Sequence, residues 1–303
     1  MKDFSGKIAV VTGGGDGMGR ELTQQLAEAG CSVAICDVDE ASMAGTVDYA
    51  MASAPQGVKV TAFHADVADE ARVHAFADHV REAHEIDHIH LLINNAGIGG
   101  GGSFVSGPRE NWERTFNVCW YGVYNNARAF MPMLVAADEG HIVNVSSVNG
   151  FWASLGPETP HTAYSAAKFA VKGFTEALVT DLRINAPHVT ASVVMPGHIG
   201  TGIALNTMRE FGSQTDLPGW NGTSEEESRR RGQEFRDNAI TSAADAARVI
   251  LAGVQDKRWR VLVGPDAEAI DAAVRSTPEE AYEGDFGLRI FAGLRSAIGA
   301  GEG

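Results

Sequence analysis

The chain contains no apolar run that could cross a membrane. Across its 303 residues, no stretch approaches the roughly 18 consecutive apolar residues of a membrane-spanning helix. The opening MKDFSGKIAVVTGGG has only about five apolar residues in a row before its glycines, fewer than an export signal needs. We therefore expect neither a membrane span nor an export signal.

Cysteine and basic side chains are scarce. The three cysteines, Cys31, Cys36 and Cys119, are odd in number and form no C-x-x-C pair, which favours a reducing cytoplasm over a disulfide framework. Lysine and arginine total 24 against 39 acidic residues, which gives a formal charge of −15. A surface with this negative charge repels nucleic-acid phosphates and anionic lipids. We therefore expect no nucleic-acid or membrane partner.

Metal-binding motifs are also missing. Histidines crowd the region from 64 to 90, but only His84 and His88 are spaced by four, and no H-E-x-x-H pattern or partner cysteine accompanies them. A metal cluster is the alternative to a solvated helix face in this region. We favour the solvated face and predict no metal.

The chain instead shows a regular alternation of strand and helix patterns. Near-continuous apolar strands separated by helices indicate a parallel sheet covered on both faces, and right-handed crossovers make such a sheet doubly wound. We predict one α/β domain of the Rossmann type over residues 1–303. The expected strands are 7–11, 32–37, 58–66, 89–97, 141–147, 189–197 and 259–264, and the expected helices are 19–30, 39–53, 69–85, 108–136 and 163–185.

Two segments lie outside this alternation. Residues 203–240 include the charged TSEEESRRRGQEFRD and the turn-rich QTDLPGWNGT. They could be a solvated helix and loop, but they follow the carboxyl end of a sheet strand, so we predict a substrate lid. Residues 265–303 are expected to form a C-terminal helical extension.

The stretch VVTGGGDGMGRE combines a strand, a glycine turn and a helix start. Gly13, Gly17 and Gly19 would let the backbone approach a pyrophosphate, which the free N–H groups of the helix would bind. Asp37 ends the next strand, where a carboxylate can accept both ribose hydroxyls of NAD and repel the 2′-phosphate of NADP. We predict NAD; the alternative is that Asp37 only caps the helix expected from residue 39.

The motif YSAAK places Tyr164 and Lys168 on one face of a helix. A nearby ammonium stabilises phenolate and lowers the pKa of the tyrosine, which suits a general acid or base near neutral pH. Ser147 ends a predicted buried strand and could hydrogen-bond a substrate oxygen. Neither feature is specific by itself, because such pairs and strand-end serines are common.

Six motifs occur together in the order found in the short-chain dehydrogenase/reductase family. They are TGGGDGMG, Asp66-Val67, NNAG at 94–97, the VNVSS strand end, YSAAK, and PGHIGT at 196–201. The chain resembles this family over roughly residues 4–202. The resemblance implies a nicotinamide-dependent alcohol dehydrogenase or ketone reductase that forms a homodimer or homotetramer.

The resemblance also implies roles for individual residues. Tyr164 would be the acid/base, Lys168 would hold the nicotinamide ribose and lower the tyrosine pKa, and Ser147 would position the reacting oxygen. Ser146 is the weaker candidate for the serine. The implied cofactor contacts are Gly13, Gly17, Met18, Gly19, Asp37, Asp66, Val67, Asn95, Ala96, Gly97, Tyr164, Lys168, Pro196, Gly197, Ile199 and Thr201.

The segment between Ser147 and Tyr164 is longer than the family usually has. It carries Phe151 and Trp152. These aromatic side chains could fill the core or face a bulky apolar or aromatic substrate. We expect them in the substrate pocket, with His198 as a further substrate contact.

The stretch TFNVCWYGVY is a second departure. Family members often carry an asparagine here that holds a helix distortion and a water linking the lysine to solvent. Counting back from Gly122, Val123 and Pro132 places Cys119 at that position, and Asn117 lies two residues too early. We therefore assign Cys119 to the asparagine position.

We predict an NAD-dependent oxidoreductase that interconverts a secondary alcohol and a ketone. The alternative is a catalytically impaired NAD-binding sensor or scaffold on the same fold, for which Cys119 is the best argument. A third possibility keeps the fold but changes the reaction to dehydration or epimerisation.

Overall fold

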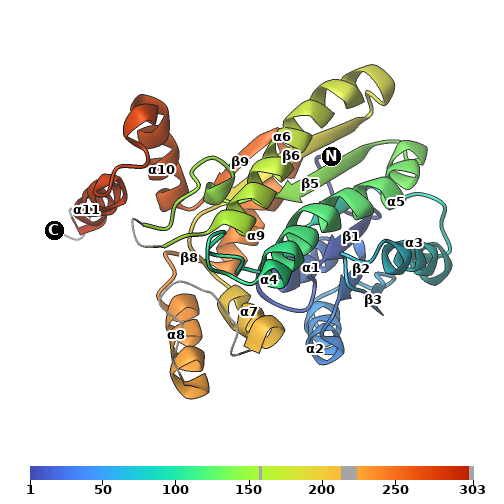
Figure 1. Ribbon diagram of the computed structural model, residues 1–303. Coiled ribbons are helices and arrows are strands. Elements are labelled where there is room, and N and C mark those ends of the chain that lie inside the picture. The colour runs from blue at the N-terminus through green and yellow to red at the C-terminus, as the bar shows by residue number, and fades with distance from the viewer. Residues whose placement is uncertain (157–158, 213–223, 300–303) are drawn as a thin grey trace.

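A seven-stranded parallel sheet forms the centre of the computed structural model, which describes residues 1–156, 159–212 and 224–299 (Figure 1). Its strand order is β3-β2-β1-β4-β5-β6-β9, so the chain reverses direction across the sheet between β1 and β4. This is the predicted doubly wound Rossmann-type arrangement. The strands are β1 Ile8–Thr12, β2 Ser32–Asp37, β3 Val60–His64, β4 Leu91–Asn94, β5 Gly140–Val145, β6 Val189–Pro196 and β9 Arg260–Val263.

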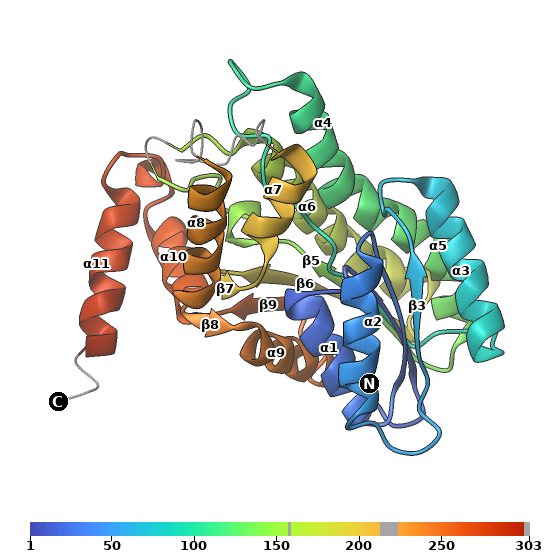
Figure 2. The same ribbon diagram turned by 90° about the horizontal axis from the view of Figure 1, so that it is seen from below.

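Helices cover both faces of the sheet, and alternate strand residues point to different layers. Val11 of β1 packs in one core cluster with α1, α2 and α9, whereas its neighbour Val10 packs in another with α3, α5 and α6. Figure 2 shows these helices flanking the sheet. The helices are α1 Gly17–Glu28, α2 Glu40–Met51, α3 Glu70–His84, α5 Gly122–Ala136, α6 Thr162–Asn185 and α9 Ala243–Gln255.

The chain is helical from 109 to 136, as expected, but this helix is not regular. A π-helical turn, Asn117–Tyr121, separates α4 (Arg109–Phe116) from α5. A π turn inserts one extra residue into the helical repeat, and such turns are frequent at functional sites. The spacing of apolar residues does not reveal one extra residue in a helical turn. The sequence pattern therefore predicts one regular helix.

Apart from α9, the helices after β6 lie outside the two layers that cover the sheet. Residues 199–200 and 241–242 form a small second sheet, β7 (Ile199–Gly200) with β8 (Thr241–Ser242). Figures 1 and 2 place α10 and α11 together beyond β9. The predicted extension is therefore helical, with residues 300–303 outside the described part. The lid segment contains α7 and α8, and its residues 213–223 also lie outside the described part. These helices are α7 Ile203–Phe211, α8 Glu225–Asp237, α10 Pro265–Ser276 and α11 Phe286–Gly299.

The histidine-rich region is less exposed than expected. His84 is buried with Nε2 2.9 Å from Thr61 Oγ1, and His90 is buried with Nδ1 accepting the Ile8 N–H at 3.2 Å. The prediction of a solvated face is therefore wrong for these two residues: His84 joins α3 to β3, and His90 binds the backbone of β1. Within 1–156, 159–212 and 224–299, no three His, Cys, Asp or Glu residues gather as metal ligands, and no helix is both long and apolar enough to cross a membrane.

Candidate active site

A cavity of about 1170 Å³ opens at the carboxyl ends of the sheet strands. It runs from the glycine turn after β1 to the C-terminal helices, and it passes the point where the strand order reverses. Ligands bind at this position in open parallel sheets. Every predicted site residue lines the cavity except Gly19, Cys119 and Phe151.

The glycine turn is closely packed against the loop after β4. Gly13 has φ of +64°, a conformation that favours glycine. A Cβ on Gly19 would lie 1.9 Å from the Gly13 carbonyl oxygen, so Gly19 closes the turn beneath the cavity and does not line it. Asn95 Nδ2 donates to the carbonyls of Thr12 and Gly13 at 3.0 and 3.1 Å, which fixes the turn.

Asp37 faces the glycine turn and does not cap α2. Its carboxylate accepts the Gly15 N–H at 3.0 Å and the Val38 N–H at 2.7 Å. Burial raises the pKa of Asp37, although these backbone donors oppose the shift. The cap of α2 is Asp39, whose Oδ1 accepts the Ser42 N–H at 3.0 Å. The alternative of a purely capping Asp37 is therefore wrong.

Asp66 is held by a residue that the sequence did not single out. Its Oδ2 lies 2.6 Å from Arg114 Nη1, and its Oδ1 accepts the Ala68 N–H at 2.9 Å. The same guanidinium pairs with Glu210 of α7 at 2.5 Å. Arg114 thus connects the end of β3 to the lid segment, and only the folded chain brings these three residues together.

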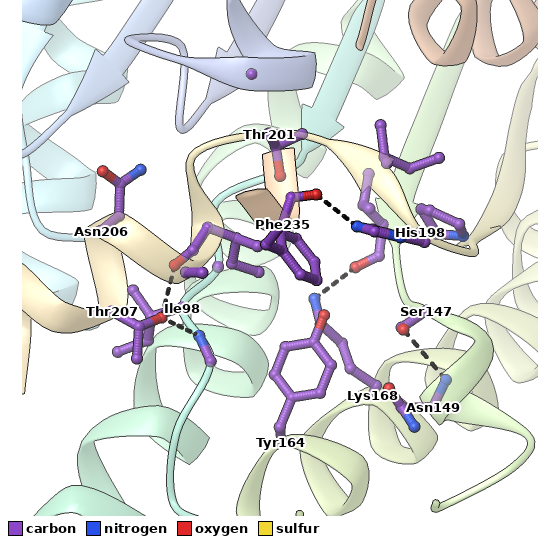
Figure 3. Close-up of a pocket in the computed structure, with 18 of the residues that line it drawn as sticks. Ile98, Ser147, Asn149, Tyr164, Lys168, His198, Thr201, Asn206, Thr207 and Phe235 are labelled. Atoms are coloured by element: carbon purple, nitrogen blue, oxygen red, sulfur yellow. Dashed lines mark hydrogen bonds between the residues drawn. The ribbon is translucent and has the colours of Figure 1, made fainter. Parts of the chain in front are cut away.

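Ser147, Tyr164 and Lys168 meet at the middle of the cavity (Figure 3). Ser147 directly follows β5, and its Oγ accepts the Asn149 N–H at 3.1 Å. Tyr164 and Lys168 lie in the first two turns of α6. Lys168 Nζ donates to the Val145 carbonyl at 2.9 Å and lies 5.4 Å from the centre of the Tyr164 ring.

Burial governs the ionisation of the tyrosine and the lysine. It lowers the pKa of Lys168 and raises the pKa of Tyr164, and the Ser147 hydroxyl opposes the tyrosine shift. The expected lowering of the Tyr164 pKa by the ammonium is therefore wrong for this arrangement. The Lys168 ammonium lies over the Tyr164 ring and donates a hydrogen bond to the Val145 carbonyl. It therefore does not offset the cost of burying a Tyr164 phenolate.

Cys119 lies behind this cluster. The π turn points its side chain to the loop after β4, where Sγ donates to the Ile98 carbonyl at 3.2 Å, and the residue is fully buried. A Cβ built on Gly97 would lie 3.6 Å from Lys168 Nζ and 3.8 Å from Cys119 Sγ, so both groups flank the same glycine. The thiol therefore lies close to the lysine but outside the cavity wall.

The long segment after Ser147 separates its two aromatic residues. Trp152 lines the cavity, and its Nε1 donates to the Ala281 carbonyl at 2.6 Å. Phe151 is not part of the cavity wall and packs against the cluster formed with Ile270 and Phe286. Trp152 therefore lines the cavity and also packs in the core. The prediction that Phe151 lines the substrate pocket is wrong, because these two adjacent residues face different sides of the chain.

The C-terminal helices supply much of the remaining wall. His198 also lines the cavity, next to Phe235 of α8. Sequence reasoning did not identify the wall residues contributed after residue 210. The apolar residues of α11 were a signal for an apolar surface, whereas the charged helix α8 gave none. These wall residues are Phe235, Asn238, Ile240, Asp266, Ile270, Tyr282, Glu283, Gly284, Gly287, Leu288 and Phe291.

The fold and the cavity together define a Rossmann-type protein with a nucleotide-sized site at the strand ends. The profile described as short chain dehydrogenase matches residues 7–210, and the chain belongs to this family of oxidoreductases.

Similar proteins cover between two thirds and nearly all of the chain. SadH of Mycobacterium tuberculosis, named as an oxidoreductase, is 38% identical over 277 residues, which cover 91% of this chain and 92% of SadH. Human epidermal retinol dehydrogenase 2 is 32% identical over 203 residues, 67% of this chain and 63% of that protein. A short-chain dehydrogenase/reductase from Burkholderia phymatum, solved in complex with NAD, has a TM-score of 0.78 and 31% identity, with 94% of this chain and 98% of that chain covered.

Proposed function

We propose that the protein is an NAD-dependent oxidoreductase that interconverts a secondary alcohol and a ketone. The observation that carries this proposal is the meeting of Ser147, Tyr164 and Lys168 in the middle of one cavity. The glycine turn and Asp37 line one half of the cavity, and an apolar wall lines the other.

The residues of the first half fit a dinucleotide. The glycine turn lines the cavity beside the start of α1, where free N–H groups suit a pyrophosphate. The carboxylate of Asp37 suits the adenosine ribose hydroxyls and repels a 2′-phosphate. Asp66, Val67, Asn95, Ala96 and Gly97 would hold the adenosine and the groove, and the 196–201 turn with Ile199 and Thr201 would hold the nicotinamide. Bound NAD would supply the hydride acceptor.

The chain's own residues would move the proton. Tyr164 Oη would accept the proton of the alcohol during oxidation or donate it to the ketone during reduction. Ser147 Oγ would hold the same substrate oxygen. Lys168 would hold the nicotinamide ribose with its ammonium.

The substrate is proposed to be bulky and apolar or aromatic. Trp152, Phe235 and Leu288 line the second half of the cavity. The two arginines among the described wall residues are both paired: Arg114 with Asp66 and Glu210, and Arg209 with Asp39. The retinol dehydrogenase relative is named for a large apolar alcohol, which supports this size class. A panel in which small charged alcohols react fastest would contradict it.

We also propose a homodimer or homotetramer in the cytoplasm. Tyr121, Tyr124 and Phe169 are exposed on the surface of the helices α5 and α6 and the turn before α5, which gives an apolar face for a second copy. All three cysteines are buried and free, which suits a reducing compartment.

The test is NADH formation from a panel of secondary alcohols, compared between the wild type and Tyr164→Phe. Loss of the phenol should lower kcat by about 10²- to 10⁴-fold while NADH binding stays within about threefold. Wild-type activity in Tyr164→Phe would refute the role of the tyrosine. NADH binding without turnover of any alcohol or ketone would instead favour the sensor or scaffold, which the burial of Cys119 argues against.

A further inference from the structure

The turn after β6 is tied to the C-terminal helix α10 by a carboxylate. Asp266, the second residue of α10, accepts the backbone N–H of His198 on Oδ2 at 2.6 Å. The ring of His198 continues the connection to α8, because its Nε2 lies 2.7 Å from the Phe235 carbonyl and the two rings lie 4.2 Å apart (Figure 3). One residue of the 196–201 turn is thus held by two helices.

The burial of Asp266 is unusual for an acidic residue. The side chain is only 2% exposed and has no ion-pair partner among the described residues, and its Oδ1 is sealed without a hydrogen-bond partner there. A carboxylate buried without a cation costs free energy. Asp271, on the same helix, is also buried but pairs with Arg260 and Arg275.

Two glycines leave the space that the carboxylate fills. A Cβ on Gly197 would lie 2.2 Å from Asp266 Oδ2, and one on Gly264 would lie 2.5 Å from Oδ1. Gly264 also has φ of +102°, which favours glycine. The backbone on both sides of the carboxylate therefore approaches it more closely than any other residue type would allow.

We propose that Asp266 is a positioning residue that holds the 196–201 turn in the conformation that receives the nicotinamide. This inference rests on the proposed function. In this role the carboxylate acts through the backbone: it fixes the His198 N–H and so the segment that leads to Ile199 and Thr201. The C-terminal extension thereby shapes the cofactor half of the cavity as well as the substrate half.

The decisive comparison is between NADH and ADP-ribose, which lacks the nicotinamide. We would measure Kd for both ligands by calorimetry in the wild type, Asp266→Leu, Asp266→Asn and Asp271→Asn. Asp266→Leu removes a hydrogen bond to a charged group and should weaken NADH at least about tenfold more than ADP-ribose. Asp266→Asn keeps an oxygen acceptor and should restore the NADH to ADP-ribose ratio to within about threefold of the wild type.

The control variant is Asp271→Asn. Asp271→Asn breaks buried ion pairs on the same helix, so it should lower the unfolding temperature without changing the ligand ratio. Equal loss of both ligands in Asp266→Leu, or a changed ratio in Asp271→Asn, would overturn the inference. If Asp266→Leu does not fold, Asp266→Ser replaces it, because its hydroxyl is too short to reach the His198 N–H. A wild type that binds ADP-ribose but not NADH would overturn both the inference and the proposed function.

Discussion

Ser146 and Ser147 are adjacent after β5, yet their hydroxyls have different partners. Both residues border the cavity, but the Ser146 Oγ donates to the Lys168 carbonyl at 2.8 Å, whereas the Ser147 Oγ accepts the Asn149 N–H at 3.1 Å. The Ser146 hydroxyl proton is thus already used within the protein, so we expect Ser147 to hold the substrate oxygen.

Ser147→Ala should therefore lower kcat/KM by about 10²-fold or more with little loss of stability, because it removes a donor to the reacting oxygen. Ser146→Ala should cost about 1–3 kcal/mol of unfolding free energy, since it leaves the Lys168 carbonyl unpaired, while activity of the folded protein falls less. Steady-state kinetics and denaturant unfolding of both variants check this. If Ser146→Ala lowered kcat/KM more than Ser147→Ala does, Ser146 would be the serine that holds the substrate oxygen.

Asp37 should determine which dinucleotide is used. Asp37→Ser removes the carboxylate that faces the ribose site, so the ratio of kcat/KM for NAD to that for NADP should fall by about 10- to 100-fold. The matched control is Asp39→Asn, because Asp39 caps α2 two residues away. This control should leave the cofactor ratio nearly unchanged. A wild type that prefers NADP, or an unchanged ratio in Asp37→Ser, would contradict the assignment.

Much of the sheet and the nucleotide half could be predicted from the sequence, because both depend on short local patterns. The apolar runs predict strands β1 to β6 and β9. Asp37 lies at the end of β2 and lines the cavity, as its position in the sequence predicts. The strands are shorter than predicted at several ends, since backbone pairing stops before the apolar pattern does. The helix 243–255 and the small β7–β8 sheet were not predicted, because their patterns are short or ambiguous.

The features that were missed depend on contacts between distant segments. Arg114 and Asp266 gain their partners only when α4 and α10 pack near the strand ends. The opposite orientations of Phe151 and Trp152 follow from the turn Val148–Gly150 and from the contact of Trp152 with Ala281. The raised pKa of Tyr164 likewise follows from its burial, which the sequence does not display.

Two histidines should make the fold sensitive to acid. Burial lowers the pKa of His141 to about 3 and that of His161 to about 4, so both are neutral in the folded chain. In the unfolded chain they bind protons near pH 6.5. Stability is therefore present above about pH 6.5 and is lost as the pH falls toward the folded values.

The contribution of His161 to the pH dependence of stability can be measured with one variant. Below about pH 6, each buried histidine should lower the unfolding free energy by about 1.4 kcal/mol per pH unit. His161→Phe keeps a ring beside Tyr164, whose ring lies 4.7 Å from that of His161, and should reduce the slope by about that amount. Denaturant unfolding from pH 7 to about pH 5 measures both slopes. Equal slopes in the variant and the wild type would contradict the assignment of a neutral buried His161.

Cys119 should be replaceable by the asparagine that its family position usually carries. The π turn sets the backbone of this position, and the Ile98 carbonyl that accepts the thiol at 3.2 Å can also accept a carboxamide N–H. Cys119→Asn should therefore keep kcat within about tenfold of the wild type, or about 1.4 kcal/mol in the barrier. Asn117→Ala is the control and should leave kcat unchanged, because no chemistry is assigned to that side chain. Complete loss of activity in a folded Cys119→Asn would show that the thiol itself is required, whereas retained activity would mean that the site needs the backbone of the π turn and not the sulfur.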